Sequence, residues 1–335
     1  MKSRKKGIIL SVVLIFAIII TALLLSFNSV IKKPFTIEKD ETIVIEQGEG
    51  FYGTLNKLDS EGKVKNITFI KLYSKLKGLN LEVLPGEYTL SADMSLKEFL
   101  DVIKEGEKIP TVNVTIPEGF TIEDIGLKLE SLDLCTVEEF TLAVESYPLP
   151  SYVSDNPEKR YNLEGFLFPD TYTVELDATP NEIIATMIRR FEEVWAKSTE
   201  GLNIADNEIE KIITIAAMIE KEAQVDKDRE LISSVIYNRI DINMPLQIDA
   251  TVIYAHGYDI KPVLYKHLEI DSPYNTYLHN TLPVGPISNP GVESIVAALN
   301  PVESNYLFYL VKGEGEHFFT NNYDEFLKKK EELGY

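Results

Sequence analysis

One glutamate in the sequence lies where a carboxylic acid could do chemistry. Between residues 207 and 224, apolar side chains recur at helical spacing. They are Ile209, Ile212, Ile213, Ala216, Ala217 and Ile219. Glu220 falls on the same stripe, four residues after Ala216. A carboxylate on a buried face costs free energy unless it is paired or functional, and partial burial raises its pKa as a general acid requires. Two interpretations follow: Glu220 is a general acid, or it is the structural partner of Arg229 or Arg239.

The other residue types exclude several kinds of active site. Cys135 is the only cysteine, which rules out a disulfide framework and a multi-cysteine zinc site. The histidines show no short metal-ligand spacing, and no G-x-S-x-G motif is present. The G-x-G-x-x-G pattern at residues 48–53 lacks the acidic residue about twenty positions later that a dinucleotide site needs. We therefore expect no metal, no cofactor and no nucleotide.

A loop-rich region follows the glutamate helix. Residues 262–301 contain six prolines, and ten of the seventeen tyrosines lie from Tyr237 onward. Loops held on a rigid scaffold often form clefts, and tyrosine offers sugars a flat apolar face with a hydroxyl. We expect residues 201–335 to form a catalytic domain of mixed helices and strands.

The N-terminal residues form a separate segment. Residues 1–7 carry four basic residues, and the following stretch, 8–28, carries no charge. Twenty helical residues span about 30 Å, the thickness of the hydrocarbon core. A cleaved signal peptide would be shorter and would end in small residues, unlike Leu23–Phe27. We predict a cytoplasmic tail at 1–7 and a single transmembrane helix at 8–28, with the remainder outside the cell membrane.

The charge of the remainder limits its partners. Four of the 33 basic residues fall in the first thirty positions, so residues 31–335 carry 29 basic and 53 acidic residues, a net charge of −24. Nucleic-acid binding needs clustered lysine and arginine, so nucleic acid is excluded. A chain held at the outer membrane surface meets lipids, wall polymers and other membrane proteins.

An internal repeat organises the middle of the chain. Residues 43–105 and 114–195 share the tripeptide Glu-Gly-Phe, at 49–51 and 118–120. Residues 85–90 match residues 169–174, and the larger offset implies an insertion of about fifteen residues in the second copy. Each match is followed by a capping box, Ser95 with Glu98 and Thr179 with Glu182. We predict an α+β fold with small β-α-α-β-α modules at 36–110 and 111–200.

Several segments in order resemble one protein family. They are residues 164–172 (E-G-F-L-F-P-D-T-Y), 219–223 (I-E-K-E-A), 235–239 (V-I-Y-N-R), 244–251, 271–277 and 285–291. Together they resemble the YceG-like family of endolytic murein transglycosylases. The resemblance implies that Glu220 is the catalytic glutamate and that the N-terminal modules are LysM-like, a module type that binds N-acetylglucosamine glycans. One departure is Thr281–Val284, where the family has a sequence like G-L-P-P.

The chemistry implied by this resemblance is cleavage of the β-1,4 bond between N-acetylmuramic acid and N-acetylglucosamine. Glu220 would protonate the leaving oxygen and then deprotonate the muramyl C6 hydroxyl, giving a 1,6-anhydro end and terminating strand elongation. The expected substrate contacts are Gln247, Asp249, Tyr274, Asn275, Ser288 and Asn289. Each of them could equally be a turn or cap residue. Asn238 and Arg239 would orient Glu220 or anchor their own helix.

Two alternatives remain open. If Asp249 activates water, the enzyme is a hydrolytic muramidase, because ordinary glycosidases use two carboxylates. If the repeats only hold glycan strands, the chain is a non-catalytic peptidoglycan-binding scaffold. By family analogy the partners are peptidoglycan strands and the peptidoglycan synthases at the membrane.

Overall fold

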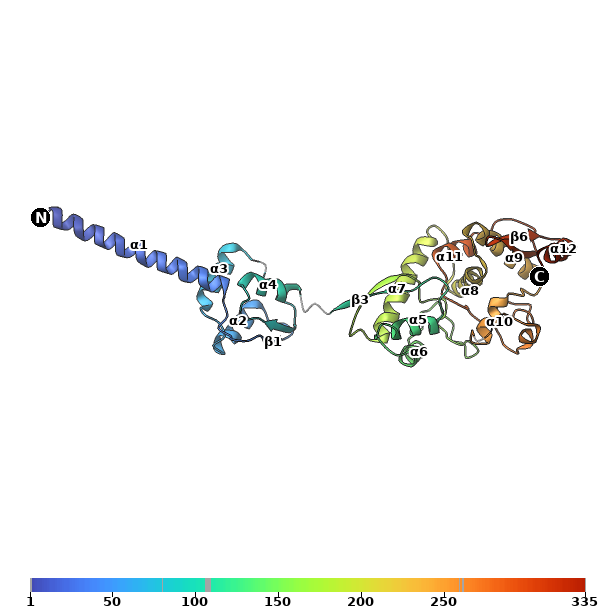
Figure 1. The fold of residues 1–335 in the computed structure, drawn as a ribbon, viewed down its shortest axis with the longest axis horizontal. Helices are drawn as coiled ribbons and strands as arrows, with labels where there is room; N and C mark the ends of the chain where they lie inside the picture. Colours follow the sequence, from blue (N-terminus) through green and yellow to red (C-terminus); the bar gives the residue numbers. More distant parts are fainter. Residues whose placement is uncertain (1, 80, 106–109, 259, 261, 335) are drawn as a thin grey trace. The chain divides into compact units, whose positions relative to one another are not determined.

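The computed structural model describes residues 2–79, 81–105, 110–258, 260 and 262–334, with the side chains of these residues from Val13 onward except that of Glu105. The chain divides into two compact units, Met1–Ile109 and Pro110–Tyr335. Figure 1 shows the helices and strands of each unit in the colours of the sequence.

Unit 1 combines a long helix with a small α+β module. Its elements in chain order are α1 (Lys2–Lys32), β1 (Glu41–Ile45), α2 (Phe51–Ser60), α3 (Ile67–Lys77), β2 (Gly86–Leu90) and α4 (Leu96–Glu105). The two strands are antiparallel and bury alternate residues, as a sheet covered on one face does. The buried face packs against residues of all three short helices, including Leu55, Ile70 and Leu96.

Helix α1 contains the predicted apolar span. Residues Val13–Lys32 are long and apolar enough to cross a membrane, by length and composition. The side chains from Val13 to Leu25 are exposed, whereas Val30 near the C-terminal end belongs to the core of unit 1. The N-terminal part of this helix is therefore apolar and exposed, whereas its C-terminal end belongs to the folded module of unit 1.

Unit 2 contains the remaining elements. They are β3 (Thr111–Thr115), α5 (Ile122–Glu130), α6 (Val137–Ser146), β4 (Thr171–Glu175), α7 (Pro180–Ser198), α8 (Asp206–Glu222), η1 (Asp226–Asp228), α9 (Arg229–Asp241), α10 (Asp249–Ala255), η2 (Tyr265–Glu269), α11 (Val292–Leu299), β5 (Phe308–Gly313), β6 (Glu316–Thr320) and α12 (Tyr323–Leu333). Strands β3 and β4 pair antiparallel, and so do β5 and β6.

The order β-α-α-β-α occurs in both predicted copies of the repeat. It runs from β1 to α4 in unit 1 and from β3 to α7 in unit 2. Both predicted capping boxes form, Ser95 with Glu98 and Thr179 with Glu182. The LysM-like character of these modules and their binding of glycan stay predictions.

The second copy shares its hydrophobic core with the region predicted as catalytic. Ile184 and Phe191 on α7 belong to the same buried cluster as Ile213 on α8 and Ile295 on α11. Helix α8 explains why the two regions share one core, because all seven of its residues from 213 to 219 are buried. A helix enclosed on every side needs partners from several segments, and residues 110–335 accordingly form one compact unit.

Candidate functional site

Glu220 lies in the last turn of α8, and its side chain is 8% exposed. Its Oε2 atom accepts three hydrogen bonds: 3.0 Å from the Gly291 backbone N–H, 2.8 Å from the Ser294 hydroxyl and 3.3 Å from Arg229 Nη1. Its Oε1 atom accepts none from the described residues. The carboxyl group is thus oriented through one oxygen, and the other oxygen is left for a further partner.

The three donors come from the starts of two helices. Gly291 is the N-cap of α11, Ser294 lies in the first turn of α11, and Arg229 is the first residue of α9. The first N–H groups of a helix have no partner within it and carry partial positive charge, so they attract a carboxylate. Arg229 also donates to the Ser294 hydroxyl. The expected arginine pairing of Glu220 is therefore made by Arg229.

A second carboxyl group, not predicted from the sequence, lies beside this site. An added Cβ at Gly291 would stand 1.9 Å from Oε1 of Glu118, so the Glu118 carboxyl packs directly against the Gly291 backbone. Two backbone hydrogen bonds hold the turn that carries Glu118. The Gly119 N–H donates to the Asn289 carbonyl at 2.9 Å, and the Asn289 N–H donates to the Phe120 carbonyl at 2.8 Å. Burial, together with the negative charge of Glu220, raises the pKa of Glu118.

The sequence carried one signal for Glu118. It belongs to the Glu-Gly-Phe tripeptide that marks the second copy of the repeat, but the first copy has Glu49 in the same place. Repetition alone indicates a structural turn in both copies. Only the approach of Gly291, which lies 173 residues further along the sequence, distinguishes Glu118.

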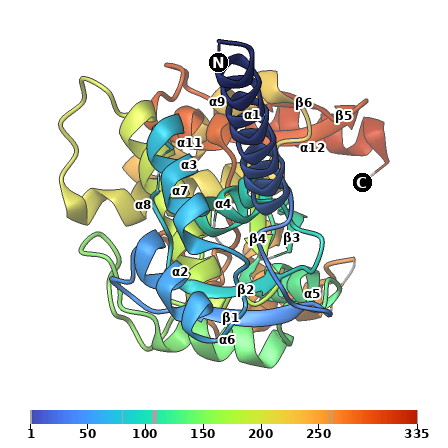
Figure 2. The ribbon, with the colours of Figure 1, turned by 90° about the vertical axis from the view of Figure 1, so that its left-hand side faces the viewer.

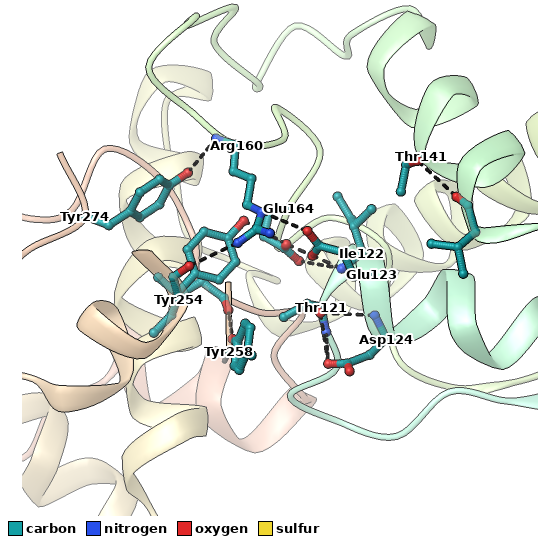
Figure 3. A network of polar contacts seen from close by, with 12 residues as sticks. Thr121, Ile122, Glu123, Asp124, Thr141, Arg160, Glu164, Tyr254, Tyr258 and Tyr274 are labelled. Atoms are coloured by element: carbon teal, nitrogen blue, oxygen red, sulfur yellow. Dashed lines mark hydrogen bonds and ion pairs between the residues drawn. The ribbon is translucent and has the colours of Figure 1, made fainter. Parts of the chain in front are cut away.

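A buried glutamate supports the loops around the site. Glu164 is fully buried and accepts hydrogen bonds from the Tyr254 hydroxyl at 3.0 Å, the Ile122 N–H at 3.2 Å and the Asn289 side-chain amide at 3.1 Å. Figure 3 shows it between α5, which begins at Ile122, and the aromatic rings of Tyr254 and Tyr274. One carboxyl group thus joins α5, α10 and the loop before α11.

Burial, followed by the negative charge of Glu123, raises the pKa of Glu164 to about 8, although the hydrogen bonds from Tyr254 and Ile122 lower it. Because the folded pKa exceeds the unfolded value, this group contributes stability in full below about pH 4.5 and loses it as the pH rises towards 8. We expect Glu164→Gln to flatten the decline in the free energy of unfolding between pH 5 and 8, by up to a few kcal/mol at about 1.4 kcal/mol per pKa unit.

The measurement is urea unfolding of the full chain in detergent at pH 5 and pH 8, followed by fluorescence of the single tryptophan, Trp195 on α7. Glu182→Gln is the matched control. The pKa of Glu182 is lowered by its capping-box hydrogen bonds, so it stays ionised over this range. A Glu164→Gln chain with the wild-type slope would contradict the assignment.

Two of the predicted substrate contacts are exposed. Gln247 lies two residues before α10, and Asp249 is the first residue of that helix. Asp249 Oδ1 accepts a 2.5 Å hydrogen bond from the Tyr277 hydroxyl. Burial, with a contribution from the negative charge of Asp249, raises the pKa of Glu222 to about 7, although the hydrogen bond from Tyr309 lowers it. No hydrogen bond between described residues joins Asp249 to Glu220.

The other four predicted contacts are buried. Tyr274 is 4% exposed, and Asn275, Ser288 and Asn289 are fully buried. Asn275 donates to the backbone carbonyls of Leu268 and Ile270, both at 2.9 Å. Tyr274 and Asn289 also bond to backbone groups of loops, whereas the Ser288 hydroxyl donates to the Ala217 carbonyl of α8 at 3.5 Å. Their burial and these contacts favour the interpretation of the four residues as structural supports of the site.

Asn238 and Arg239 anchor their helix to neighbouring loops. The Asn238 amide donates to the carbonyls of residues 304 and 306, and Arg239 donates to those of residues 245, 246 and 307. Neither makes a hydrogen bond to Glu220 among the described residues. Of the two roles expected for this pair, the structure shows the anchoring contacts.

Within the described ranges, no group of three or more His, Cys, Asp or Glu side chains is arranged to hold a metal ion. A hollow of about 510 Å³ is lined by the segments at 158–160, 254–257 and 272–274, and Glu220 is not among its lining residues. The Glu220 carboxyl group, oriented by a helix start and an arginine, can transfer protons.

Comparison with known proteins gives one family. The model of the YceG-like family matches residues 43–332. The endolytic murein transglycosylase of Bacillus subtilis (strain 168) is 32% identical over 311 residues, covering 88% of this chain and 86% of that protein. The endolytic murein transglycosylase of Streptococcus pneumoniae serotype 2 (strain D39) is 28% identical over 86% of this chain, which spans only 57% of that protein.

A solved structure gives the same family. The crystal structure of a YceG-like protein from Listeria monocytogenes matches with a TM-score of 0.60 and 31% identity, covering 87% of this chain and 99% of that one. The family match extends over both units and includes Glu118, Glu164 and Glu220. This chain therefore belongs to the YceG-like family.

Proposed function

We propose that the protein is a membrane-anchored endolytic lytic transglycosylase, which cleaves the N-acetylmuramic acid–β-1,4–N-acetylglucosamine bond of nascent peptidoglycan strands and terminates their elongation. The observation that carries this proposal is the geometry of Glu220, whose Oε2 is held by three donors while Oε1 is left for a substrate. The curated relatives named endolytic murein transglycosylase supply the substrate class.

The reaction uses Glu220 twice. When protonated, it donates its proton to the leaving glycosidic oxygen, and the substrate N-acetyl group stabilises the positive charge that develops at C1. The ionised Glu220 then takes the proton of the muramyl C6 hydroxyl as that oxygen bonds to C1, which closes the 1,6-anhydro ring. The Gly291, Ser294 and Arg229 donors stabilise the ionised form between the two proton transfers.

Glu118 favours a second candidate, a hydrolytic muramidase. A hydrolase of this kind needs a second carboxylate as nucleophile or as base for water. The structure offers Glu118 for that position, whereas the sequence pointed to Asp249. The raised pKa of Glu118 opposes this role, because a base or nucleophile acts in its ionised form.

Mass spectrometry of the products separates these candidates. We expect the full chain in detergent to release strands with 1,6-anhydro ends, which are lighter by one water than reducing muramic acid ends. Products with reducing ends only would overturn the transglycosylase proposal in favour of hydrolysis. Retained glycan binding with no cleavage by the wild-type protein would instead indicate a non-catalytic scaffold.

The proposed place of action is the outer surface of the cell membrane. Helix α1 serves as the single-pass anchor, with the basic residues of 1–7 in the cytoplasm by the positive-inside rule. The modules of LysM-like type would hold glycan strands, and peptidoglycan synthases would be the neighbouring partners.

A further inference from the structure

Helix α3 in unit 1 exposes leucines on one side. Its opposite side supplies Ile70 and Ser74 to the core, and both are buried. Leu72 is 46% exposed and Leu76 is 72% exposed. Exposed leucines at neighbouring positions on one short helix form an apolar surface that needs a partner.

This surface continues the side of α3 that contacts α1. The ring of Phe27 on α1 lies 5.5 Å from Phe69 and 6.1 Å from Tyr73, both on α3. At about 100° per residue, Leu76 lies about 20° and Leu72 about 60° from Phe69 around the helix axis. Figures 1 and 2 both show α3 beside the C-terminal end of α1. The exposed leucines therefore lie next to the apolar span, Val13–Lys32, to which Phe27 belongs.

The same segment is basic in an acidic protein. Residues 63–79 contain five lysines and no acidic residue, whereas the whole chain has a net charge of −20. Lys75 and Lys77 are exposed and form no ion pair with the described residues, and Lys71 donates to the neutral Asn56 amide. Lysine stems cover apolar surface while their charges stay in water, an arrangement typical of helices at membrane interfaces.

We propose that α3 lies on the outer surface of the bilayer, with Leu72 and Leu76 in the interfacial layer and the lysines at anionic phospholipid headgroups. The proposal rests on α1 being the membrane anchor. Because Phe27 is part of the span, the α3 residues in contact with it lie at the depth where the span leaves the hydrocarbon, and aromatic rings favour that depth. Unit 1 is then held against the membrane by two elements.

The test uses the full chain in vesicles of phosphatidylcholine and phosphatidylglycerol. In a Cys135→Ser background, which removes the only native thiol, Leu76→Cys carries an environment-sensitive fluorophore. The matched control is Val44→Cys, 48% exposed on β1 of the same unit. We expect the emission at position 76 to be blue-shifted and quenched by spin-labelled lipids, and that at position 44 to be neither.

A charge variant tests the lysines separately. Near an anionic surface each lysine raises the equilibrium constant for association of α3 with the bilayer about five-fold. The double variant Lys75→Gln with Lys77→Gln should therefore lower this constant roughly 25-fold and reduce the lipid quenching at position 76. Equal emission and quenching at positions 76 and 44, in protein that floats with the vesicles, would overturn the proposal. A blue shift without lipid quenching would also overturn it, because a protein surface then covers α3. Failure to float would refute the α1 anchor itself, and this inference with it.

Discussion

Replacing Glu220 by glutamine is expected to abolish strand cleavage while the fold is retained. The amide oxygen can still accept the hydrogen bonds from Gly291 and Ser294, so the local geometry survives. The amide has no proton to give at working pH and cannot take one from the C6 hydroxyl. Loss of a general acid and base costs about 10²–10⁴-fold for each role, which predicts activity below detection.

The measurement is release of soluble fragments from purified glycan strands by the full chain in detergent, with circular dichroism to verify the fold. Glu208→Gln is the matched control, because Glu208 is an exposed carboxylate on the same helix. It should cleave at the wild-type rate. Near-normal cleavage by Glu220→Gln would remove Glu220 from the mechanism.

The largest loss of stability is expected for Gly165→Ala. Gly165 has a φ of +90°, a conformation that alanine adopts only with strain. An added Cβ would stand 2.6 Å from Cβ of Pro286 and 2.8 Å from Cγ2 of Ile213. Both neighbours are fixed, one in a proline ring and the other in the enclosed helix α8. Strain and overpacking together predict a loss of about 3–5 kcal/mol in the free energy of unfolding.

Gly201→Ala is the matched control for this prediction. Its φ is +81°, but nothing lies within 4 Å of the added Cβ, so only the backbone strain applies. That strain costs about 1–2 kcal/mol. Urea unfolding followed by Trp195 fluorescence compares the two variants. Equal losses in the free energy of unfolding would show that the loop at Pro286 moves to accommodate the added Cβ, and would contradict the prediction that close packing at Gly165 contributes to the loss.

The local elements followed from local patterns. Apolar spacing predicted a helix over 207–224, and α8 runs from Asp206 to Glu222. Capping boxes placed the starts of α4 and α7, and the β-α-α-β-α order predicted for residues 36–110 and 111–200 included the strands β1 and β3. These signals work because a helix cap or a strand face is decided by residues within a few positions of one another. The apolar spacing missed that Thr214, Ile215 and Met218 are also buried, because enclosure depends on distant segments.

The site depended on such distant contacts. Polar residues in proline-rich loops resemble ligand contacts in sequence, yet Asn275, Ser288 and Asn289 are fully buried, because loop carbonyls and N–H groups need internal partners. Exposure is not encoded by residue type. The sequence therefore could not identify which side chains of these loops face outward.

The sequence by itself determined a long apolar N-terminal segment, a repeated β-α-α-β-α order and a glutamate, Glu220, on the apolar face of a helix. Only the tertiary structure decided what that glutamate meets. Its donors Gly291 and Ser294 lie 71 and 74 residues further along the chain, and Glu118 approaches from 102 residues before it. Periodicity specifies which face of a helix is buried, whereas the neighbours of that face are fixed by packing the whole of unit 2 around α8.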